Sequence, residues 1–147
     1  MSIQAHYRPA TNTDLRQIKD FLSENQLPDS GVDAWLDNFI IAEDEKSALI
    51  GVAGFELHDK TALLRSVAVD KNFRGHGNGR ILVEIIVKNA EVRGAKTVYL
   101  LTDNASAYFE RLGFEIVSRD NVDESVKTSV EFTALCRDAT VMRKVLN

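Results

Sequence analysis

Three glycines at alternate positions, with an arginine on either side, form the part of this sequence best suited to bind a charged ligand. The segment reads Arg74-Gly75-His76-Gly77-Asn78-Gly79-Arg80 and follows the polar turn Asp70-Lys71-Asn72. Glycine has no Cβ, so backbone N–H groups in such a loop can approach a ligand closely. Where the loop leads into a helix, these donors and the helix dipole favour an anion, and arginine can bind phosphate oxygens bidentately. The residues therefore predict a site for a phosphorylated ligand.

The spacing of the glycines distinguishes between known phosphate-binding loops. A Walker loop would end in Gly-Lys-Ser/Thr, but Arg80 and Ile81 follow Gly79 here. A dinucleotide fingerprint, Gly-x-Gly-x-x-Gly, belongs to an early βαβ unit, whereas these glycines alternate and lie in the middle of the chain. A glycine-rich surface turn is the alternative without a ligand.

The composition indicates one globular domain. The chain has 147 residues, of which 44% are hydrophobic and 27% charged, which suits a single domain with a real core. Its net charge of −4 argues against nucleic acid as the main partner. No apolar run reaches membrane-spanning length and the N-terminus lacks a signal-peptide core, so we expect a cytoplasmic protein without a membrane partner. The single cysteine, Cys136, excludes an intramolecular disulfide and a Cys-cluster metal site, and we expect no metal.

The elements that must position the loop follow from apolar periodicity and turn residues. Strands are expected at residues 3–8, 38–42, 48–57, 61–69, 97–101, 114–118 and 139–146. Helices are expected after Thr11 and at residues 79–93 and 104–112, with shorter ones near 32–36 and 126–135. This order combines an antiparallel meander with βαβ crossovers. We therefore predict an α/β (α+β) fold with a mixed, mostly antiparallel sheet of six to seven strands and helices on both faces.

Two local signals add detail to these elements. Thr11 and Asp14 have the spacing of a capping box at the start of the first helix. Gly51 and Gly54, inside the strand expected at 48–57, predict bulges or close approaches of other groups.

The loop and the strand before it resemble a known family. Arg74-x-x-Gly77-x-Gly79 after a Val-rich strand is similar to the Arg/Gln-x-x-Gly-x-Gly/Ala signature of the Gcn5-related N-acetyltransferases (GNATs). The resemblance implies one GNAT domain over residues 1–147, N-acetyltransferase activity and acetyl-CoA as cosubstrate, with its pantetheine arm on backbone groups of the central strand. The donor-binding residues that it implies are Val67, Ala68, Val69, Arg74, Gly75, His76, Gly77, Asn78, Gly79, Arg80 and Phe109.

Two branches of this family resemble further parts of the chain. The run Leu101-Thr102, Tyr108-Phe109 and Gly113-Phe114 is similar to enzymes of the N-acetylglutamate synthase type, which act on amino acids. Segments 63–69, 99–102 and 131–136 resemble GNATs encoded in bacterial arsenic-resistance operons, although Arg137 replaces the proline usual there. The implied acceptor is a small-molecule amine, such as an amino acid or an amino-acid-like toxicant. A protein or peptide amine and a non-catalytic CoA sensor are the alternatives, and the expected assembly is a monomer or homodimer.

Two residues are candidates for proton transfer. Glu56, late in its strand, is the candidate general base, with a solvated edge glutamate and water-mediated deprotonation as the alternatives. Tyr108 is the candidate acid for the thiolate, although Phe109 occupies the position where the family has its tyrosine. One residue along a helix is a rotation of about 100°, so a packing role for Tyr108 is the alternative.

Arg65 is the candidate substrate-binding residue. It stands four residues before Val69, and strand alternation places it on one sheet face with Val67 and Val69. Its guanidinium could bind the carboxylate of an amino-acid acceptor, or it could form a structural ion pair with Glu56.

The cysteine and two of the histidines carry less information. Cys136 could contact an arsenical or pack in the core. His6 and His58 show no partner pattern and are expected at the surface.

Overall fold

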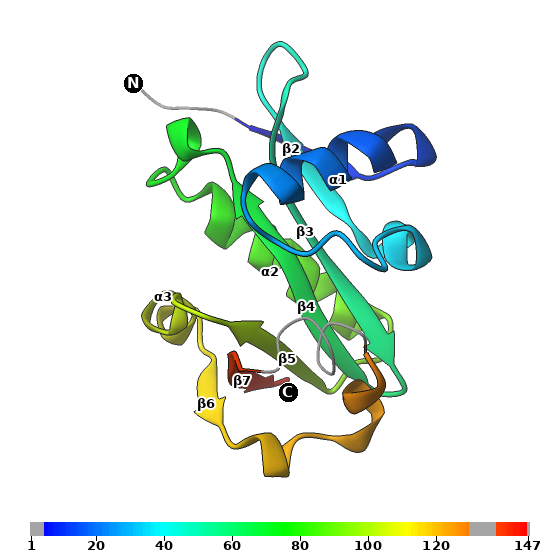
Figure 1. Cartoon of the computed structure of the whole chain (residues 1–147), viewed down its shortest axis with the longest axis vertical. Coiled ribbons are helices and arrows are strands. Elements are labelled where there is room, and N and C mark those ends of the chain that lie inside the picture. Colours follow the sequence, from blue (N-terminus) through cyan, green and yellow to red (C-terminus); the bar gives the residue numbers. More distant parts are fainter. Residues whose placement is uncertain (1–4, 130–137, 147) are drawn as a thin grey trace.

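Seven strands form one mixed sheet in the computed structural model, which describes residues 5–129 and 138–146 (Figure 1). The strands are β1 (His6–Pro9), β2 (Ile40–Glu43), β3 (Leu49–His58), β4 (Thr61–Val69), β5 (Thr97–Thr102), β6 (Glu115–Val117) and β7 (Thr140–Val145). Their order across the sheet is β1-β2-β3-β4-β5-β7-β6. β4 and β5 pair in parallel and the other neighbours pair antiparallel, which confirms the predicted mixed, mostly antiparallel sheet.

Helices cover both faces of this sheet, as predicted. They are α1 (Leu15–Glu24), α2 (Asn78–Val92) and α3 (Ser106–Arg111). Short 3-10 segments are η1 (Asn12–Asp14), η2 (Asp33–Asn38), η3 (Lys71–Phe73), η4 (Arg119–Asn121) and η5 (Glu124–Thr128). α1 lies in front of the sheet in Figure 1 and α2 lies behind it.

Two of the short predicted helices differ from the structure. The helix near 32–36 is the 3-10 segment η2, which is kinked at Trp35. For residues 126–129 the helix predicted at 126–135 is wrong, because η5 is a 3-10 segment that ends at Thr128 and Ser129 after it is extended. The rest of that prediction lies outside the described residues.

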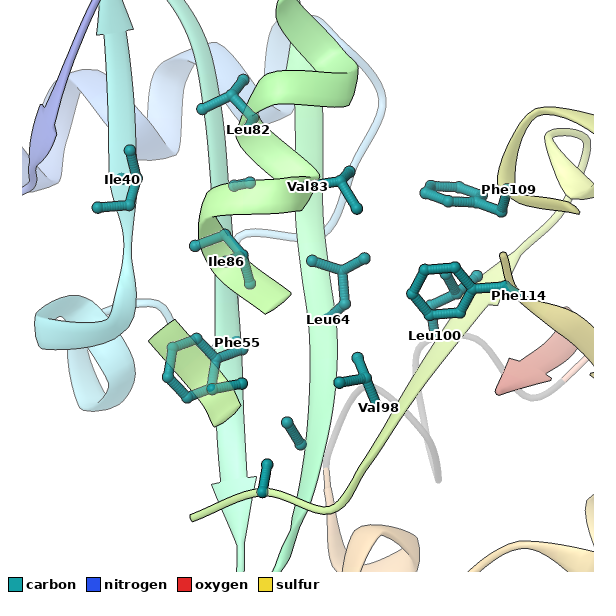
Figure 2. Packing of buried hydrophobic residues seen from close by; sticks show 14 of the residues in the cluster. Ile40, Phe55, Leu64, Leu82, Val83, Ile86, Val98, Leu100, Phe109 and Phe114 are labelled. Atoms are coloured by element: carbon teal, nitrogen blue, oxygen red, sulfur yellow. The ribbon is translucent and has the colours of Figure 1, made fainter. Parts of the chain in front are cut away.

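The larger core cluster packs α2 against the central strands. Figure 2 shows Leu82, Val83 and Ile86 of α2 in one cluster with Phe55 and Leu64 of the central strands. These side chains have 0–2% of their surface exposed, and full burial of one such side chain contributes roughly 1.5–3 kcal/mol. The same cluster continues to Phe109 and Phe114 near α3, so the core links the start of α2 to α3.

A second cluster packs α1 and η2 on the opposite face. It includes Ile18 and Leu22 of α1, Phe39 after η2, and Val52 of β3. Gly54 of β3 lies directly under Phe39, because a Cβ at Gly54 would stand 2.5 Å from the Phe39 ring. The close approach predicted at Gly54 is therefore present, and it lets the ring lie flat on the strand.

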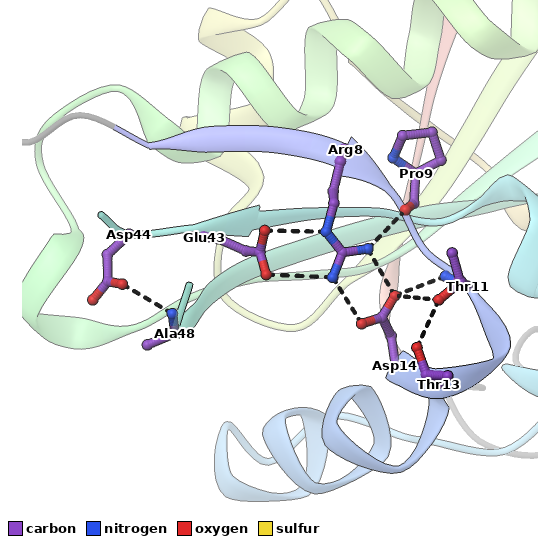
Figure 3. A network of polar contacts seen from close by, with 8 residues as sticks. All are labelled: Arg8, Pro9, Thr11, Thr13, Asp14, Glu43, Asp44 and Ala48. Atoms are coloured by element: carbon purple, nitrogen blue, oxygen red, sulfur yellow. Dashed lines mark hydrogen bonds and ion pairs between the residues drawn. The ribbon is translucent and has the colours of Figure 1, made fainter. Parts of the chain in front are cut away.

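A network around Arg8 fixes the first strand to the start of α1 (Figure 3). Arg8 donates hydrogen bonds to both carboxylate oxygens of Asp14, each at 2.9 Å, and to Glu43 at 3.0 and 3.3 Å. The Asp14 carboxylate also accepts from the Thr11 N–H at 2.7 Å, as the predicted capping box requires. Arg8 and these hydrogen bonds lower the pKa of Asp14 to about 2.

The lowered pKa predicts an acid-sensitive contribution to stability. Because the pKa of Asp14 is lower in the folded chain than the usual 3.8, the contribution is complete above about pH 4 and disappears as the pH falls towards 2. Asp14→Asn should lower the free energy of unfolding by about 2 kcal/mol at pH 7 and by much less near pH 2. Urea unfolding at both pH values measures this, with Asp20→Asn on the exposed face of α1 as the control. Equal losses for Asp14→Asn at both pH values would contradict the assignment.

Candidate functional site

A cleft opens where β4 and β5 separate. The parallel pairing runs from Thr61 with Thr97 to Leu64 with Leu100 and ends there, although both strands continue. Figure 1 shows the two strands diverging beyond this point. The cleft has a volume of about 480 Å³ and is lined by residues 25–28, 64–67 and 100–105 with Phe109 and Ala139. One edge of β4 after Leu64 therefore faces the cleft, and no strand within residues 5–129 and 138–146 pairs with it there.

A β-bulge at Ser66 shapes this part of β4. Gly54 of β3 pairs with Arg65 and Val52 pairs with Ala68, so one residue of β3 lies opposite two residues of β4. Ser66 adopts φ +62°, which is uncommon for a residue with a side chain. A bulge of this kind bends the strand and redirects the side chains that follow it.

The bulge overturns the predicted face of Arg65. Val67 and Val69 pack against the cluster formed with α2, whereas Arg65 reaches Ser30 on the face that carries α1 and η2. The prediction that Arg65 shares a sheet face with Val67 and Val69 is therefore wrong, because strict alternation ends at Ser66.

Arg65 and Glu56 form a buried ion pair. Arg65 Nη1 donates to Glu56 Oε2 at 2.8 Å, and the two side chains are 0% and 3% exposed. Arg65 also donates to the Ser66 hydroxyl at 3.0 Å and to the Ser30 carbonyl at 2.7 Å. The ion pair with Glu56 is the structural interpretation of Arg65 that the sequence left open. The bond to Ser30 attaches the segment before η2 to Arg65, which lines the cleft. A contact between Arg65 and an acceptor carboxylate stays a prediction.

Glu56 has a second partner that the sequence did not indicate. His58 Nε2 lies 2.8 Å from Glu56 Oε1, and the His58 ring packs edge-on against Trp35 at 5.3 Å between centroids. The expectation that His58 is a surface residue without a partner is therefore wrong. Both oxygens of Glu56 are occupied, and its role as a general base stays a prediction.

The glycine loop has the geometry of an anion site. Gly75 and Gly77 adopt φ of +82° and +83°, and among the described residues no atom beyond their chain neighbours lies within 4 Å of where a Cβ would stand on either. Gly77 is the N-cap of α2, and the first helical hydrogen bond runs from the Ile81 N–H to the Gly77 carbonyl at 3.0 Å. The N–H groups of the three residues between them have no partner inside the helix, so they can bind phosphate oxygens.

Side chains of the loop hold its shape. Asn78 is buried, accepts from the Tyr7 hydroxyl at 2.8 Å and donates to the Phe73 carbonyl at 3.2 Å. Arg74 donates to the Val69 carbonyl at 2.9 Å and to Asn25 at 3.1 Å. These bonds fix the loop to β1, to the end of β4 and to the end of α1.

The outer side chains of the loop are accessible. His76 is exposed, and the Arg80 side chain is 65% exposed with Glu84 at 3.6 Å. Arg80 can therefore turn towards a ligand on the loop at little cost, because an exposed ion pair contributes at most about 1 kcal/mol.

The structure separates the two neighbouring aromatic residues of α3. Phe109 lines the cleft and is 8% exposed. Tyr108 points to the glycine loop instead, since a Cβ on Gly79 would lie 2.7 Å from the Tyr108 hydroxyl. Burial raises the pKa of Tyr108, against a smaller opposite effect of Arg111 and Arg80. The role of Tyr108 as an acid for the thiolate stays a prediction.

The glycine loop lies at the end of the strand that borders the cleft. The Cβ position of Gly79 is 3.6 Å from Val69 Cγ2, so the start of α2 touches the end of β4. A larger hollow of about 650 Å³ lies beside α1 and includes Arg74. Neither Phe109 nor residues 64–67 of β4, which line the cleft, belong to the lining of this hollow. We therefore place the candidate site in the cleft and the loop together.

The sequence did not predict that the polar residues of two turns line the cleft. Residues 25–28 follow α1, Thr102 ends β5, and Asp103 and Asn104 come directly after it. The signals were present in Leu27-Pro28 and in the polar Asp103-Asn104 turn, but nothing in the sequence shows that these turns face each other. Cys136 lies outside the described residues.

The described residues hold neither a grouped set of metal ligands nor a membrane-spanning helix. Over residues 5–129 and 138–146, no three His, Cys, Asp or Glu side chains are grouped as metal ligands. In the same part of the chain, no helix combines the length and the apolar character needed to cross a bilayer.

Comparison with known proteins agrees with this geometry. Residues 35–116 match the sequence model of the acetyltransferase (GNAT) domain. An uncharacterised N-acetyltransferase of Chlorobaculum tepidum is 32% identical over 60% of this chain and 57% of its own length. The [ribosomal protein bS18]-alanine N-acetyltransferase of Salmonella typhimurium is 33% identical over 52% of this chain and 53% of its own. The chain thus spans about half the length of these relatives.

One solved structure extends the similarity in fold to the whole chain. The N-acetylglutamate synthase of Neisseria gonorrhoeae, complexed with coenzyme A and N-acetyl-glutamate, superposes with a TM-score of 0.84 at 19% identity. The match covers 100% of this chain and 36% of that one. At this level of identity it supports the arrangement of strands and helices.

Proposed function

Because this chain belongs to the acetyltransferase (GNAT) domain family, we propose that it is an acetyl-CoA-dependent N-acetyltransferase acting on the amine of a small molecule. The observation that carries the proposal is the cleft between β4 and β5, which has the glycine loop at the end of its bordering strand. These two features supply what the reaction needs, an anchor for the donor and a place for the acceptor.

The residues of the loop fit the diphosphate of coenzyme A. The N–H groups of Asn78, Gly79 and Arg80 stand at the start of α2, and the space beside Gly77 is open. Arg80 is exposed beside them and carries a positive charge. Acetyl-CoA supplies an acetyl thioester, and the open edge of β4 beyond Leu64 is positioned to bind its pantetheine arm by backbone hydrogen bonds.

The cleft contributes mainly by positioning. Holding an amine beside the bound donor turns a bimolecular reaction into an effectively unimolecular one. This can lower the activation free energy of acetyl transfer by several kcal/mol. The amine must lose a proton, and we assign its removal to water held by the polar wall that includes Thr102, Asp103 and Asn104.

The size of the cleft supports a small acceptor. Its volume of about 480 Å³ falls within the range of small-molecule sites, roughly 300–1,000 Å³. The cleft must hold the pantetheine arm along β4 as well as the acceptor, and this favours a small acceptor. Amino acids, and amino-acid-like toxicants of the arsenic-resistance type, belong to the acceptor class that we propose. The fold shared with N-acetylglutamate synthase supports an amino-acid acceptor, and the relative that acetylates an alanine of a ribosomal protein supports a peptide as the alternative.

A screen of amines tests the proposed function. The chain is mixed with acetyl-CoA and with single amino acids, polyamines or a peptide that begins with alanine, and free thiol and the acetylated product are measured. We expect thiol release with an amino acid or a similar small amine, matched by one acetylated product. Preference for the peptide would favour the alternative, and CoA binding without transfer to any amine would favour a sensor.

A further inference from the structure

The hydroxyl of Tyr108 occupies a gap that Gly79 leaves open. Gly79 lies inside α2 and its φ is not in the left-handed region, so its backbone does not require glycine. Glycine within a helix costs about 1 kcal/mol relative to alanine. A Cβ at this position would stand 2.7 Å from the Tyr108 hydroxyl and 3.6 Å from Val69. The missing side chain therefore makes room for the hydroxyl.

This hydroxyl can donate a hydrogen bond, and it has no acceptor in the part of the chain that the structure describes. Within residues 5–129 and 138–146, the Tyr108 hydroxyl makes no hydrogen bond, although a partly buried tyrosine usually finds a partner. Burial raises the pKa of Tyr108, so the group is protonated at neutral pH. By contrast, the Tyr7 hydroxyl near the same loop is bonded to Asn78 at 2.8 Å.

The surroundings of the hydroxyl favour a negatively charged partner. Arg80 and Arg111 both act on Tyr108 through their positive charges, and the Arg111 guanidinium lies 6.0 Å from the ring centre. The N–H groups at the start of α2 lie near the Tyr108 hydroxyl, because Gly79, which carries one of them, is the residue that the hydroxyl approaches. A phosphate oxygen on the loop next to Tyr108 would thus lie in the positive field of two arginines and beside backbone donors.

Aromatic packing fixes the direction of the hydroxyl. The Tyr108 ring meets Phe109 edge-on at 5.2 Å between centroids, and Phe109 meets Phe114 in the same way at 6.0 Å. Phe109 and Phe114 belong to the main core cluster. The hydroxyl is therefore held over the loop before any ligand arrives, and this pre-organisation reduces the cost of using it.

We propose that Tyr108 is a donor-binding residue whose hydroxyl donates a hydrogen bond to the diphosphate of acetyl-CoA. The proposal rests on the proposed function, because it takes acetyl-CoA as the ligand of the glycine loop. It divides the two aromatic residues of α3 between two tasks, with Tyr108 on the diphosphate and Phe109 in the wall of the cleft.

Calorimetric titration of CoA and of dephospho-CoA into the full chain tests this inference without an acceptor. Tyr108→Phe should raise the Kd for CoA about tenfold, the lower end of what a hydrogen bond to a charged group contributes. The same factor is expected for dephospho-CoA, which keeps the diphosphate and lacks the 3′-phosphate. Tyr99→Phe removes a hydroxyl that contacts the Asp123 N–H at 3.3 Å and serves as the matched control with unchanged Kd.

The outcomes of the titration distinguish the role of Tyr108 from the proposed function of the chain. An unchanged Kd in a folded Tyr108→Phe variant would overturn the inference and leave the proposed function standing. A loss seen with CoA but not with dephospho-CoA would place the hydroxyl on the 3′-phosphate and also overturn it. If the unaltered chain bound neither compound, the proposed function would fail first, and this inference with it.

Kinetics separate this role from that of an acid. With any acceptor found by the amine screen, Tyr108→Phe should raise KM for acetyl-CoA and leave kcat nearly unchanged. A drop of kcat by a hundredfold at saturating donor, in the range of a lost general acid, would show that Tyr108 protonates the thiolate and would overturn the inference.

Discussion

Gly77→Val is expected to weaken CoA binding at least a hundredfold. Gly77 adopts φ +83° as the N-cap of α2, a conformation that is unfavourable for a β-branched residue. Its side chain would also fill the open space beside the loop N–H groups. Losing two hydrogen bonds to a charged diphosphate, at about 1.5–3 kcal/mol each, accounts for a change of this size. Calorimetric titration with CoA measures the effect.

Gly94→Val is the matched control for this experiment. Gly94 follows α2 at its other end, has φ +101° and also has no atom within 4 Å of a Cβ position. Both substitutions strain the backbone in a similar way, but Gly94 is a full helix length away from the loop. Gly94→Val should lose stability and keep its affinity for CoA. A folded Gly77→Val variant with normal affinity would show that CoA does not bind to this loop.

Glu56→Gln is expected to lower the free energy of unfolding by about 3–5 kcal/mol, the usual cost of breaking a buried ion pair by changing one of its members. The Arg65 side chain is 0% exposed, and Glu56 is the carboxylate beside it at 2.8 Å. Glutamine keeps the shape of the side chain and removes the negative charge that contacts the Arg65 guanidinium and His58. Urea unfolding of the purified chain measures the loss.

Glu84→Gln makes the same chemical change in an exposed ion pair. Glu84 is 64% exposed and lies 3.6 Å from Arg80, so its loss should cost less than about 1 kcal/mol. Comparable losses for the two variants would show that burial does not strengthen the pair of Arg65 and Glu56.

The strand and loop of the candidate site were predictable because their signals are local. The strand predicted at 61–69 has the same bounds as β4, and α2 begins one residue before its predicted start at 79. β-branched residues, a polar turn and closely spaced glycines do not depend on distant parts of the chain. The close approach at Gly54 was predictable for the same reason, although its partner, Phe39, was not.

The bulge at Ser66 was not predictable, and it changed the candidate site. Serine has no strong preference for positive φ, so the conformation at Ser66 depends on tertiary contacts such as the hydrogen bond that its hydroxyl accepts from Arg65. A single inserted residue exchanges the two faces of a strand. Arg65 therefore lies among buried partners on the α1 face, where the periodicity of the sequence had not placed it.

The direction of Tyr108 required the structure for a similar reason. The sequence shows that Tyr108 and Phe109 are adjacent on a helix, but it does not fix the rotation of that short helix. Packing of Phe109 on Phe114 sets the rotation, and it sends the Tyr108 hydroxyl to Gly79 rather than into the cleft.

In the proposed complex, the acyl donor lies along the cleft edge of β4 with its diphosphate on the glycine loop. Backbone amide NMR signals, recorded while CoA is added to the chain, test it most directly. We expect large shifts for Val67, Gly77 and Gly79, with little change for Ile18 and Leu22 in the buried face of α1. Shifts confined to the hollow beside α1, around Gln17 and Asp20, with Gly77 and Gly79 unmoved, would contradict it.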